Sequence, residues 1–169
     1  MDTIEALLTR RSIRRFTNKP VADDQLQTIL KAAMYAPSAG NQQPWEFLVI
    51  TSRTMLDRIP DAHPFAAMAR QAQIAILVCA NASRFSKEPM WSQDCSAATQ
   101  NILLAAHAQG LGAVWCGVYP RAERMVGLSD LLNLPDNIIP FSLVPIGWPA
   151  EEKGDPNRFD KFRIHMDRW

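Results

Sequence analysis

The sequence predicts a single domain of the α/β or α+β class. Apolar runs of strand length alternate with segments of helical periodicity along the whole chain. No internal repeat, low-complexity tract or linker rich in Pro, Gly or Ser divides its 169 residues, a length within the usual size of one domain. Residues 1–169 are therefore expected to form one domain.

Two helices are predicted at the start of the chain. The first runs from Asp2 to about Arg11, because three apolar residues share one face. These are Ile4, Leu7 and Leu8. The second begins near Asp23 and ends before Pro37, since a proline disfavours helical geometry in the preceding residue.

The middle of the chain predicts two strands with short helices between them. After a polar loop, Pro37–Pro44, the segment Trp45–Ile50 is typical of a strand. Short helices are expected over Thr54–Ala72, with a break at Pro64. The run Ile74–Cys79 is apolar throughout, which indicates a strand buried on both faces.

The longest helix is predicted from Trp91 to Gln109, where Gly110 ends it. A short strand is expected at Ala113–Val118, and Pro120 is suited to open the next helix. Arg84–Trp91, just before the long helix, is a candidate partial lid.

A third apolar strand is predicted at Ile138–Ile146. Pro140 and Pro145 interrupt it, and prolines favour an edge strand or a strand end. The final segment, Glu151–Trp169, is charged but keeps several large apolar residues: Phe159, Phe162, Ile164 and Trp169. We expect this segment to be docked, with a partner subunit as one candidate surface.

Charge and cysteine content limit the function classes. A formal net charge of +1 gives no overall field that would attract nucleic acid or an anionic membrane. The N-terminus lacks a secretory signal pattern, and the apolar run Ile74–Ala80 is far shorter than a membrane-spanning helix. Three scattered cysteines without CxxC spacing favour reduced thiols. We therefore expect a cytoplasmic protein.

The strongest local feature is the arginine cluster Arg10-Arg11-Ser12-Ile13-Arg14-Arg15-Phe16. Guanidinium groups present planar forks of donors that match phosphate oxygens. The alternative is a basic helix end that complements the helix dipole. From the residues alone, both interpretations stay open.

Two further segments could line a ligand. The loop Pro37–Trp45 combines small residues, amides and an aromatic, so it could approach a flat ring closely, although a plain connection is the alternative. In Gly110–Gly117, a glycine at a strand end could bring backbone N–H groups against a ligand. Its alternative is a helix cap followed by a buried strand.

Several motifs are absent. The sequence has no GxGxxG after a strand, no GxxxxGK(S/T) and no GxSxG elbow. His63, His107 and His165 lack metal-ligand spacing, so no metal site is expected. Cys116 has no evident base beside it and is expected to be a packing residue rather than a nucleophile.

Taken in order, the segments resemble the FMN-dependent nitroreductase family. The matching pieces are RRSIRRF after the first helix, APSAGNQQPW, GLGAVWCG, and an apolar strand that runs into IGWP before a tail ending in Trp169. The resemblance covers essentially the whole chain. It implies an α+β fold, with a mixed sheet flanked by helices, and an intertwined homodimer with FMN sites across the interface.

The resemblance also implies which residues contact FMN. The phosphate and ribityl chain would be held by Arg10, Arg11 and Ser12, with Arg14 near the pyrimidine edge of the flavin. From the other subunit, the ring would be lined by Pro37, Ser38, Ala39 and Asn41. The opposite side would be bordered by Trp115, Cys116 and Gly117, with a backbone N–H near the flavin N5. Arg158 matches the late arginine that reaches the phosphate, with Lys161 and Arg163 as alternatives.

The implied activity is that of an FMN oxidoreductase. It would take hydride from NADH or NADPH and pass it to a small oxidised molecule, such as a nitroaromatic or a quinone, in a ping-pong cycle. No catalytic side chain is expected, because the flavin carries the chemistry. One alternative keeps FMN but changes the reaction to dehydrogenation, dehalogenation or flavin fragmentation. Another is a non-catalytic module whose arginines bind RNA or a phosphoprotein.

Overall fold

The computed structural model describes residues 1–86 and 90–169. A 5-stranded sheet has the order β1-β2-β5-β3, and β4 also pairs with β5. The strands are β1 (Trp45–Ile50), β2 (Ile74–Asn81), β3 (Gly112–Ala113), β4 (Cys116–Gly117) and β5 (Ile138–Gly147). All four strand pairings are antiparallel, and an isolated bridge between Ser12 and Ala113 adds a parallel component. The predicted α+β class is confirmed.

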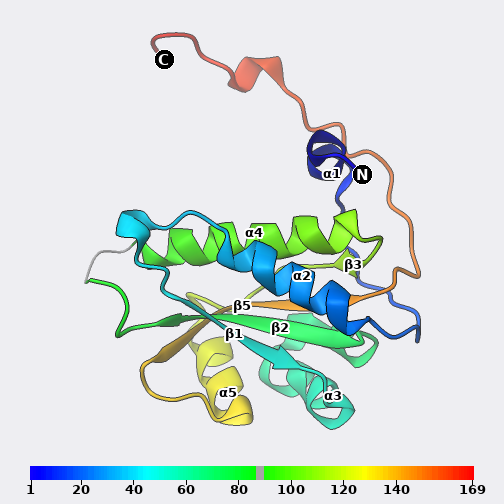
Figure 1. The fold of residues 1–169 in the computed structure, drawn as a ribbon, viewed down its shortest axis with the longest axis vertical. Helices are drawn as coiled ribbons and strands as arrows, with labels where there is room; N and C mark the ends of the chain where they lie inside the picture. Colours follow the sequence, from blue (N-terminus) through cyan, green and yellow to red (C-terminus); the bar gives the residue numbers. More distant parts are fainter. Residues whose placement is uncertain (87–89) are drawn as a thin grey trace.

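Helices cover both faces of the sheet (Figure 1). One layer is formed by α2 (Asp23–Met34) and α4 (Trp91–Ala108), as the helical periodicity predicts. The other layer is formed by α3 (Arg53–Ala62), the 3₁₀ helix η2 (Pro64–Arg70) and α5 (Ala122–Leu132). The break between α3 and η2 falls at His63–Pro64, where the sequence predicts it.

The core lies on both sides of β2 and β5, because successive side chains of a strand point to opposite faces. Ile76 and Val78 pack in the cluster under α2 and α4, whereas Leu77 and Cys79 pack in the cluster under α3 and α5. Full burial of a side chain such as Leu77 contributes about 1.5–3 kcal/mol. The strand is therefore buried on both faces, as its apolar run predicts.

Of the two positions that the prolines favour, an edge strand or a strand end, the edge is wrong, because β5 pairs on both of its sides. Pro140 and Pro145 lie near the two ends of β5. Pro140 stands opposite Cys79 at a register shift, and bulges tolerate proline. The carbonyl of Pro145 accepts from the Val114 N–H at 3.4 Å, so its missing N–H faces the same side. Because the pairing with β5 is interrupted there, between β3 and β4, the missing N–H of Pro145 costs the sheet little hydrogen bonding.

Two boundaries after α4 differ from the prediction. The expected strand Ala113–Val118 is divided into β3 and β4, with Val114 and Trp115 between them. The helix expected to open at Pro120 begins at Ala122 instead, and the Tyr119–Pro120 peptide bond is cis. Pro120 therefore belongs to the connection between β4 and α5 and does not start the helix.

The first helix is shorter and more exposed than predicted. α1 spans Thr3–Thr9, and Arg10 already has extended backbone with ψ of 131°. The chain leaves the helix because Ile13 donates its N–H to the Ala113 carbonyl at 3.0 Å, a sheet contact that competes with helical bonding. The face made of Ile4, Leu7 and Leu8 is exposed rather than packed on the body.

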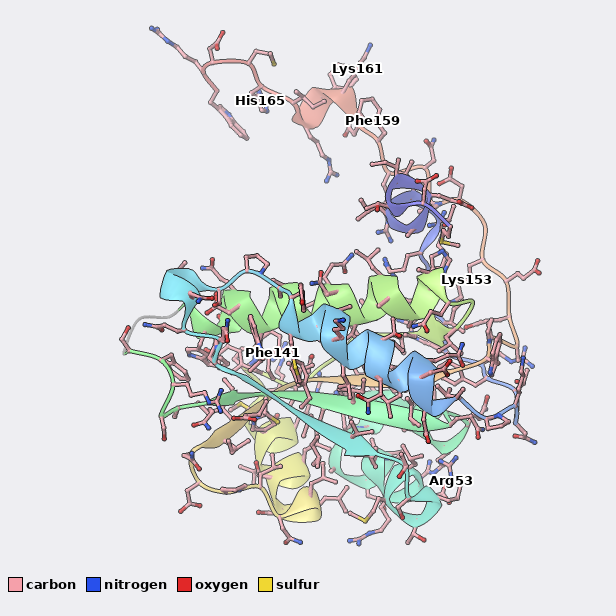
Figure 2. The ribbon with its side chains drawn as sticks, viewed as in Figure 1. Arg53, Phe141, Lys153, Phe159, Lys161 and His165 are labelled. Carbon is pink, nitrogen blue, oxygen red and sulfur yellow. The ribbon has the colours of Figure 1, made fainter. Side chains whose placement is uncertain are left out.

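The C-terminal residues extend away from the body, beyond α1 (Figure 1). Phe159, Lys161 and His165 lie along this tail, which contains the short helix η3 (Lys161–Arg163) (Figure 2). Within one chain the start of the tail contacts Arg11 and Arg14, whereas its later residues are exposed, and the expectation that it docks on a partner stays a prediction. Of the candidate lid Arg84–Trp91, residues 87–89 lie outside the described part.

Candidate functional site

The segment after α1 lies against the end of the sheet. Ser12 forms its bridge with Ala113 of β3, and a Cβ on Gly112 would stand 2.7 Å from the Ile13 Cγ2 atom. Only glycine at that position lets the two segments approach so closely. Arg14 is exposed, and its backbone N–H donates to the Glu151 carboxylate, which lowers the pKa of Glu151.

A cleft of about 270 Å³ separates the end of α1 from the start of the tail. Its walls carry Leu7, Leu8, Arg10, Arg11, Arg158 and the residues from Asp155 to Phe159. The pKa of Arg10 is lowered by burial first, and then by the positive charges of Arg158 and Arg11. A bound anion would relieve this repulsion, so the cleft suits a phosphate.

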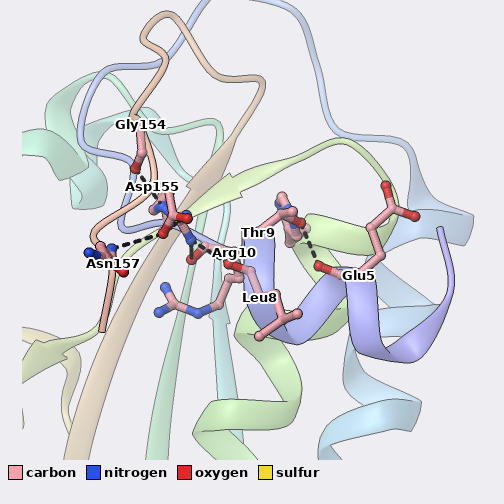
Figure 3. Close-up of polar contacts among 9 residues, drawn as sticks. Glu5, Leu8, Thr9, Arg10, Gly154, Asp155 and Asn157 are labelled. Atoms are coloured by element: carbon pink, nitrogen blue, oxygen red, sulfur yellow. Dashed lines mark hydrogen bonds and ion pairs between the residues drawn. The ribbon is translucent and has the colours of Figure 1, made fainter. Parts of the chain in front are cut away.

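The three arginines do not have equal freedom. Arg11 donates to the carbonyls of Leu8 (2.8 Å) and Gly154 (2.9 Å), and it lies 3.6 Å from the Asp155 carboxylate. Figure 3 shows Gly154, Asp155 and Asn157 of the tail beside Arg10 at the end of α1. Arg11 therefore fastens the tail to α1, while Arg10 and Arg158 face the cleft.

Neither alternative to Arg158 lines this cleft. Lys161 lies over the ring of Phe162, 5.4 Å from its centroid, and Arg163 pairs with Asp160 at 3.3 Å. Of the three cations that the sequence offers as contacts to the phosphate, the geometry therefore favours Arg158.

The small-residue loop is held in a defined shape by its backbone. The Ala39 N–H donates to Asp94 Oδ1 at 2.9 Å, and the Gln43 N–H donates to the Ser38 hydroxyl at 3.0 Å. Gly40 and Asn41 have φ of 56° and 55°, in the left-handed region that glycine and asparagine tolerate best. Pro37 and Asn41 are exposed, and Ser38 and Ala39 are half-buried.

The arginine cleft and the loop lie at opposite ends of α4 (Figure 1). Asp94, in the first turn of α4, holds the loop, while His107, in the last turn, contacts Thr9 of α1 at 2.8 Å. Thirteen residues of α-helix separate these two contacts by about 20 Å. One chain thus does not bring the two predicted groups together.

The glycine-containing segment borders open space. A Cβ on Gly117 would meet no atom within 4 Å, although β4 is otherwise packed. Trp115 is half-buried with its ring against Phe141, at 5.8 Å between centroids. Burial raises the pKa of the Cys116 thiol to about 11, and the charges of Arg14 and Arg124 oppose this increase. Cys116 is therefore a packing residue, as expected.

The arginine segment lies beside the sheet, because Ser12 bridges Ala113 of β3 and the Ile13 N–H donates to the Ala113 carbonyl, four residues before Gly117. The stretch Arg10–Arg14 thus runs from the arginine cleft toward the open space at Gly117. Four residues of extended chain cover about 13 Å. Of the predicted residues, the structure therefore joins the arginine cluster to the Gly117 segment.

Sequence reasoning missed three buried or half-buried polar residues near these groups. His63 Nε2 lies 2.9 Å from the Gly117 carbonyl oxygen, and Arg124 Nη1 donates to the same oxygen at 2.7 Å. Asp94 is 6% exposed, and its second carboxylate oxygen has no hydrogen-bond partner among the described residues. No local pattern marks these residues, because only the fold brings them to their targets.

An antiparallel sheet between two helical layers, with a cationic cleft at one end of the long helix, defines an α+β class of protein suited to an anionic ligand. The chain belongs to the nitroreductase family, whose model matches residues 7–63 and 62–148. A relative from Methanothermobacter thermautotrophicus, provisionally named NADH dehydrogenase/NAD(P)H nitroreductase, is 48% identical over 169 residues. The match covers 100% of this chain and 88% of the relative.

Solved structures agree with this assignment. An FMN-dependent nitroreductase from Clostridium difficile R20291 superimposes with a TM-score of 0.91 at 29% identity, covering 99% of this chain and 100% of that one. A protein from Desulfovibrio desulfuricans, provisionally assigned as a nitroreductase and solved in complex with FMN, gives a TM-score of 0.85 at 31% identity. That match covers 100% of this chain and 99% of the other. Across residues 1–86 and 90–169, no helix is long and apolar enough to cross a membrane.

Proposed function

We propose that two copies of this chain bind FMN at their interface and pass reducing equivalents from NADH or NADPH to an oxidised organic acceptor, such as a nitroaromatic or a quinone. The observation that carries this proposal is the separation of the arginine cleft from the small-residue loop by the length of α4. A ligand that uses both groups must take them from two chains. Two-fold symmetry then gives two equal sites.

The residues present fit FMN at both of its ends. The arginine cleft offers Arg10 and Arg158 to a phosphate, and their mutual repulsion favours an anion. The open space at Gly117 leaves room for a flat ring against the backbone of β4. The proteins from Clostridium difficile and Desulfovibrio desulfuricans are named for FMN, which supports the same cofactor here.

When bound, FMN supplies the hydride chemistry, and the protein supplies binding, orientation and charge. Arg10 and Arg158 bind the phosphate, and Ser12 contributes a hydroxyl beside β3. Arg14, two residues beyond the Ser12 bridge to β3, would supply a fixed cation that favours negative charge on the flavin. The partner's loop, Pro37 to Asn41, would cover the ring. No acid or base side chain is required.

The acceptor and the nicotinamide are small molecules, and we propose no nucleic-acid or membrane partner. The three cysteines are free and buried, which fits the reduced thiols expected in the cytoplasm. The cytoplasmic location and the homodimer stay predictions.

One preparation tests the proposal. Purified protein is expected to be yellow, to release FMN on denaturation in a ratio near one per chain, and to sediment as a dimer. NADH or NADPH should bleach the bound flavin, and a quinone or nitroarene should restore its absorbance. A colourless monomer that binds no added FMN would refute the proposal and favour the non-catalytic alternative. Flavin that bleaches but is not reoxidised by either acceptor would favour a sister activity.

A further inference from the structure

The carbonyl of Gly117 is held by two side chains from different elements. His63, the residue that ends α3, lies with Nε2 at 2.9 Å from this oxygen. Because a carbonyl only accepts, Nε2 carries the proton in this contact. Arg124, in the first turn of α5, donates to the same oxygen at 2.7 Å. One donor would satisfy the carbonyl, so the second fixes its direction further.

The strand geometry links this carbonyl to the Gly117 N–H. The next residue, Val118, donates its N–H to the Phe141 carbonyl of β5 at 3.2 Å. Successive residues of a strand direct their backbone groups to opposite edges, so Gly117 directs both its carbonyl and its N–H away from β5. A donor pair that fixes the carbonyl therefore also restrains the N–H of a glycine that has no side chain to restrain it.

Both donors are themselves held in place. His63 is 1% exposed, and its Nδ1 has no hydrogen-bond partner among the described residues, so the Gly117 oxygen is its anchor. Burial lowers the pKa of His63, the contact with the Gly117 carbonyl opposes this, and the nearby Arg124 charge adds to it, so the neutral ring is favoured. Arg124 also lies over the Phe65 ring, 4.9 Å from its centroid. The pair thus forms a rigid support beneath the open space at Gly117.

We propose that His63 and Arg124 are positioning residues that hold the Gly117 peptide so that its N–H is directed at the bound flavin ring. This inference rests on the proposed FMN site. Neither side chain touches the cofactor in this account. Both act through the backbone of β4, and Arg124 in addition adds a positive charge on the same side of the sheet as His63.

The test compares two histidine variants. His63→Leu removes the donor, whereas His63→Gln keeps an N–H in place of Nε2–H. We expect His63→Leu to weaken FMN binding about tenfold and to shift the visible absorption band of the bound flavin, because the Gly117 carbonyl then keeps only its Arg124 donor and the N–H is less restrained. His63→Gln should restore both values to within about threefold of the wild type.

An arginine pair supplies the matched control. Arg124→Gln is expected to lower FMN affinity and the flavin reduction potential. Arg53→Gln removes an arginine that likewise donates to two backbone carbonyls, but to those of Ala69 and Ala72 rather than to that of Gly117. It should leave the potential unchanged even if it lowers the melting temperature. If His63→Leu does not fold, the Arg124 and Arg53 pair decides the question.

Amide hydrogen exchange in the FMN-free protein separates this inference from the proposed function. His63→Leu should speed exchange at Val118, whose N–H donates to the Phe141 carbonyl, whether or not FMN binds. Wild-type protein that binds no FMN would refute the site and the positioning role together, while unchanged exchange would refute the support itself. Wild-type affinity, absorption spectrum and potential in folded His63→Leu and Arg124→Gln proteins would overturn the inference and leave the FMN site standing.

Discussion

The two ends of α4 carry opposite kinds of surface. At its C-terminal end lie the arginines of the α1 cleft, whose charges repel one another. At its N-terminal end lies an uncharged loop of small residues, fixed by a buried carboxylate. The first end is suited to a charged group and the second to a flat apolar one. Each end therefore resembles half of a cofactor site.

A second contrast indicates how the halves meet. The body of the chain buries most of its large apolar side chains, whereas α1 and the tail expose most of theirs: Leu8 is 69% exposed, Phe159 81% and Trp169 100%. Exposed apolar surface on this scale marks interaction sites. The elements beside the arginine cleft are thus the ones that lack a partner within the chain, and a second copy would supply both the cover and the loop.

The largest effect is expected from the double variant Arg10→Ala/Arg158→Ala. Two charge-assisted contacts of about 1.5–3 kcal/mol each would be lost, which lowers FMN affinity by about 10² to 10⁴-fold. Fluorescence titration measures this affinity. Riboflavin, which lacks the phosphate, should bind the variant and the wild type alike. An equal loss for both ligands would show that the cleft does not hold the phosphate. Lys161→Ala serves as the control cation outside the cleft.

Arg14→Ala is expected to weaken FMN binding by one such contact, about 1.5–3 kcal/mol, and to lower the reduction potential of the bound flavin. The cause is the loss of a fixed cation that stabilises the reduced, anionic ring. Dye-coupled potentiometry measures the potential. Arg15→Ala, one residue along the chain, is the matched control. Unchanged affinity and potential in Arg14→Ala would remove it from the site.

At the other end of α4, Asp94→Ala should destabilise the loop. The Ala39 N–H loses its acceptor, which costs about 1–3 kcal/mol. FMN and riboflavin should both bind less tightly, in contrast to the arginine variant, because the loop is proposed to contact the ring. Asp94→Asn keeps a carbonyl oxygen at Oδ1 and should retain most of the affinity. A selective loss of FMN over riboflavin would contradict this assignment.

The smallest effect concerns acid stability. Burial lowers the pKa of His63 and of His107 below the ordinary value of 6.5. In the pH range between the lowered pKa and 6.5, the unfolded chain binds more protons than the folded one. The stabilisation is therefore complete above 6.5 and is lost as the pH falls below it. Urea unfolding should show this decline, and His63→Gln should reduce its slope. A free energy of unfolding that rises as the pH falls below 6.5 would contradict this prediction.

Much of the fold could be predicted from the sequence, because buried strands and amphipathic helices repeat their apolar residues at fixed periods. α2, β2 and α4 are of this kind. Pro140 and Pro145 indicate an edge strand or a strand end, and only the edge was wrong. Pro140 lies at a bulge and Pro145 faces the gap between β3 and β4, so neither missing N–H breaks the pairing. The early end of α1 was missed because a distant carbonyl, that of Ala113, draws the chain out of the helix.

The candidate site was predictable where it lies in contiguous motifs and hidden where it does not. The arginine cluster and the loop are visible as short runs of unusual composition. Asp94 and Arg124 are single polar residues within helices, and His63 is a single residue between α3 and η2. Their targets, the carbonyl of Gly117 and the N–H of Ala39, are backbone atoms of distant segments. Because every residue has a backbone carbonyl and nearly every residue a backbone N–H, the sequence does not show which of them a side chain contacts.

Complementation between two defective chains tests the central claim most directly. One chain carries Arg10→Ala/Arg158→Ala, and the other carries Ala39→Trp, which fills the space that the loop is proposed to leave for the ring. Each alone should bind almost no FMN. After the two are unfolded together, mixed in equal amounts and refolded, half of the dimers are mixed and each holds one intact site, so about a quarter of the wild-type FMN should bind. If the mixture binds no more FMN than the separate variants, each site lies within one chain, and the account is contradicted.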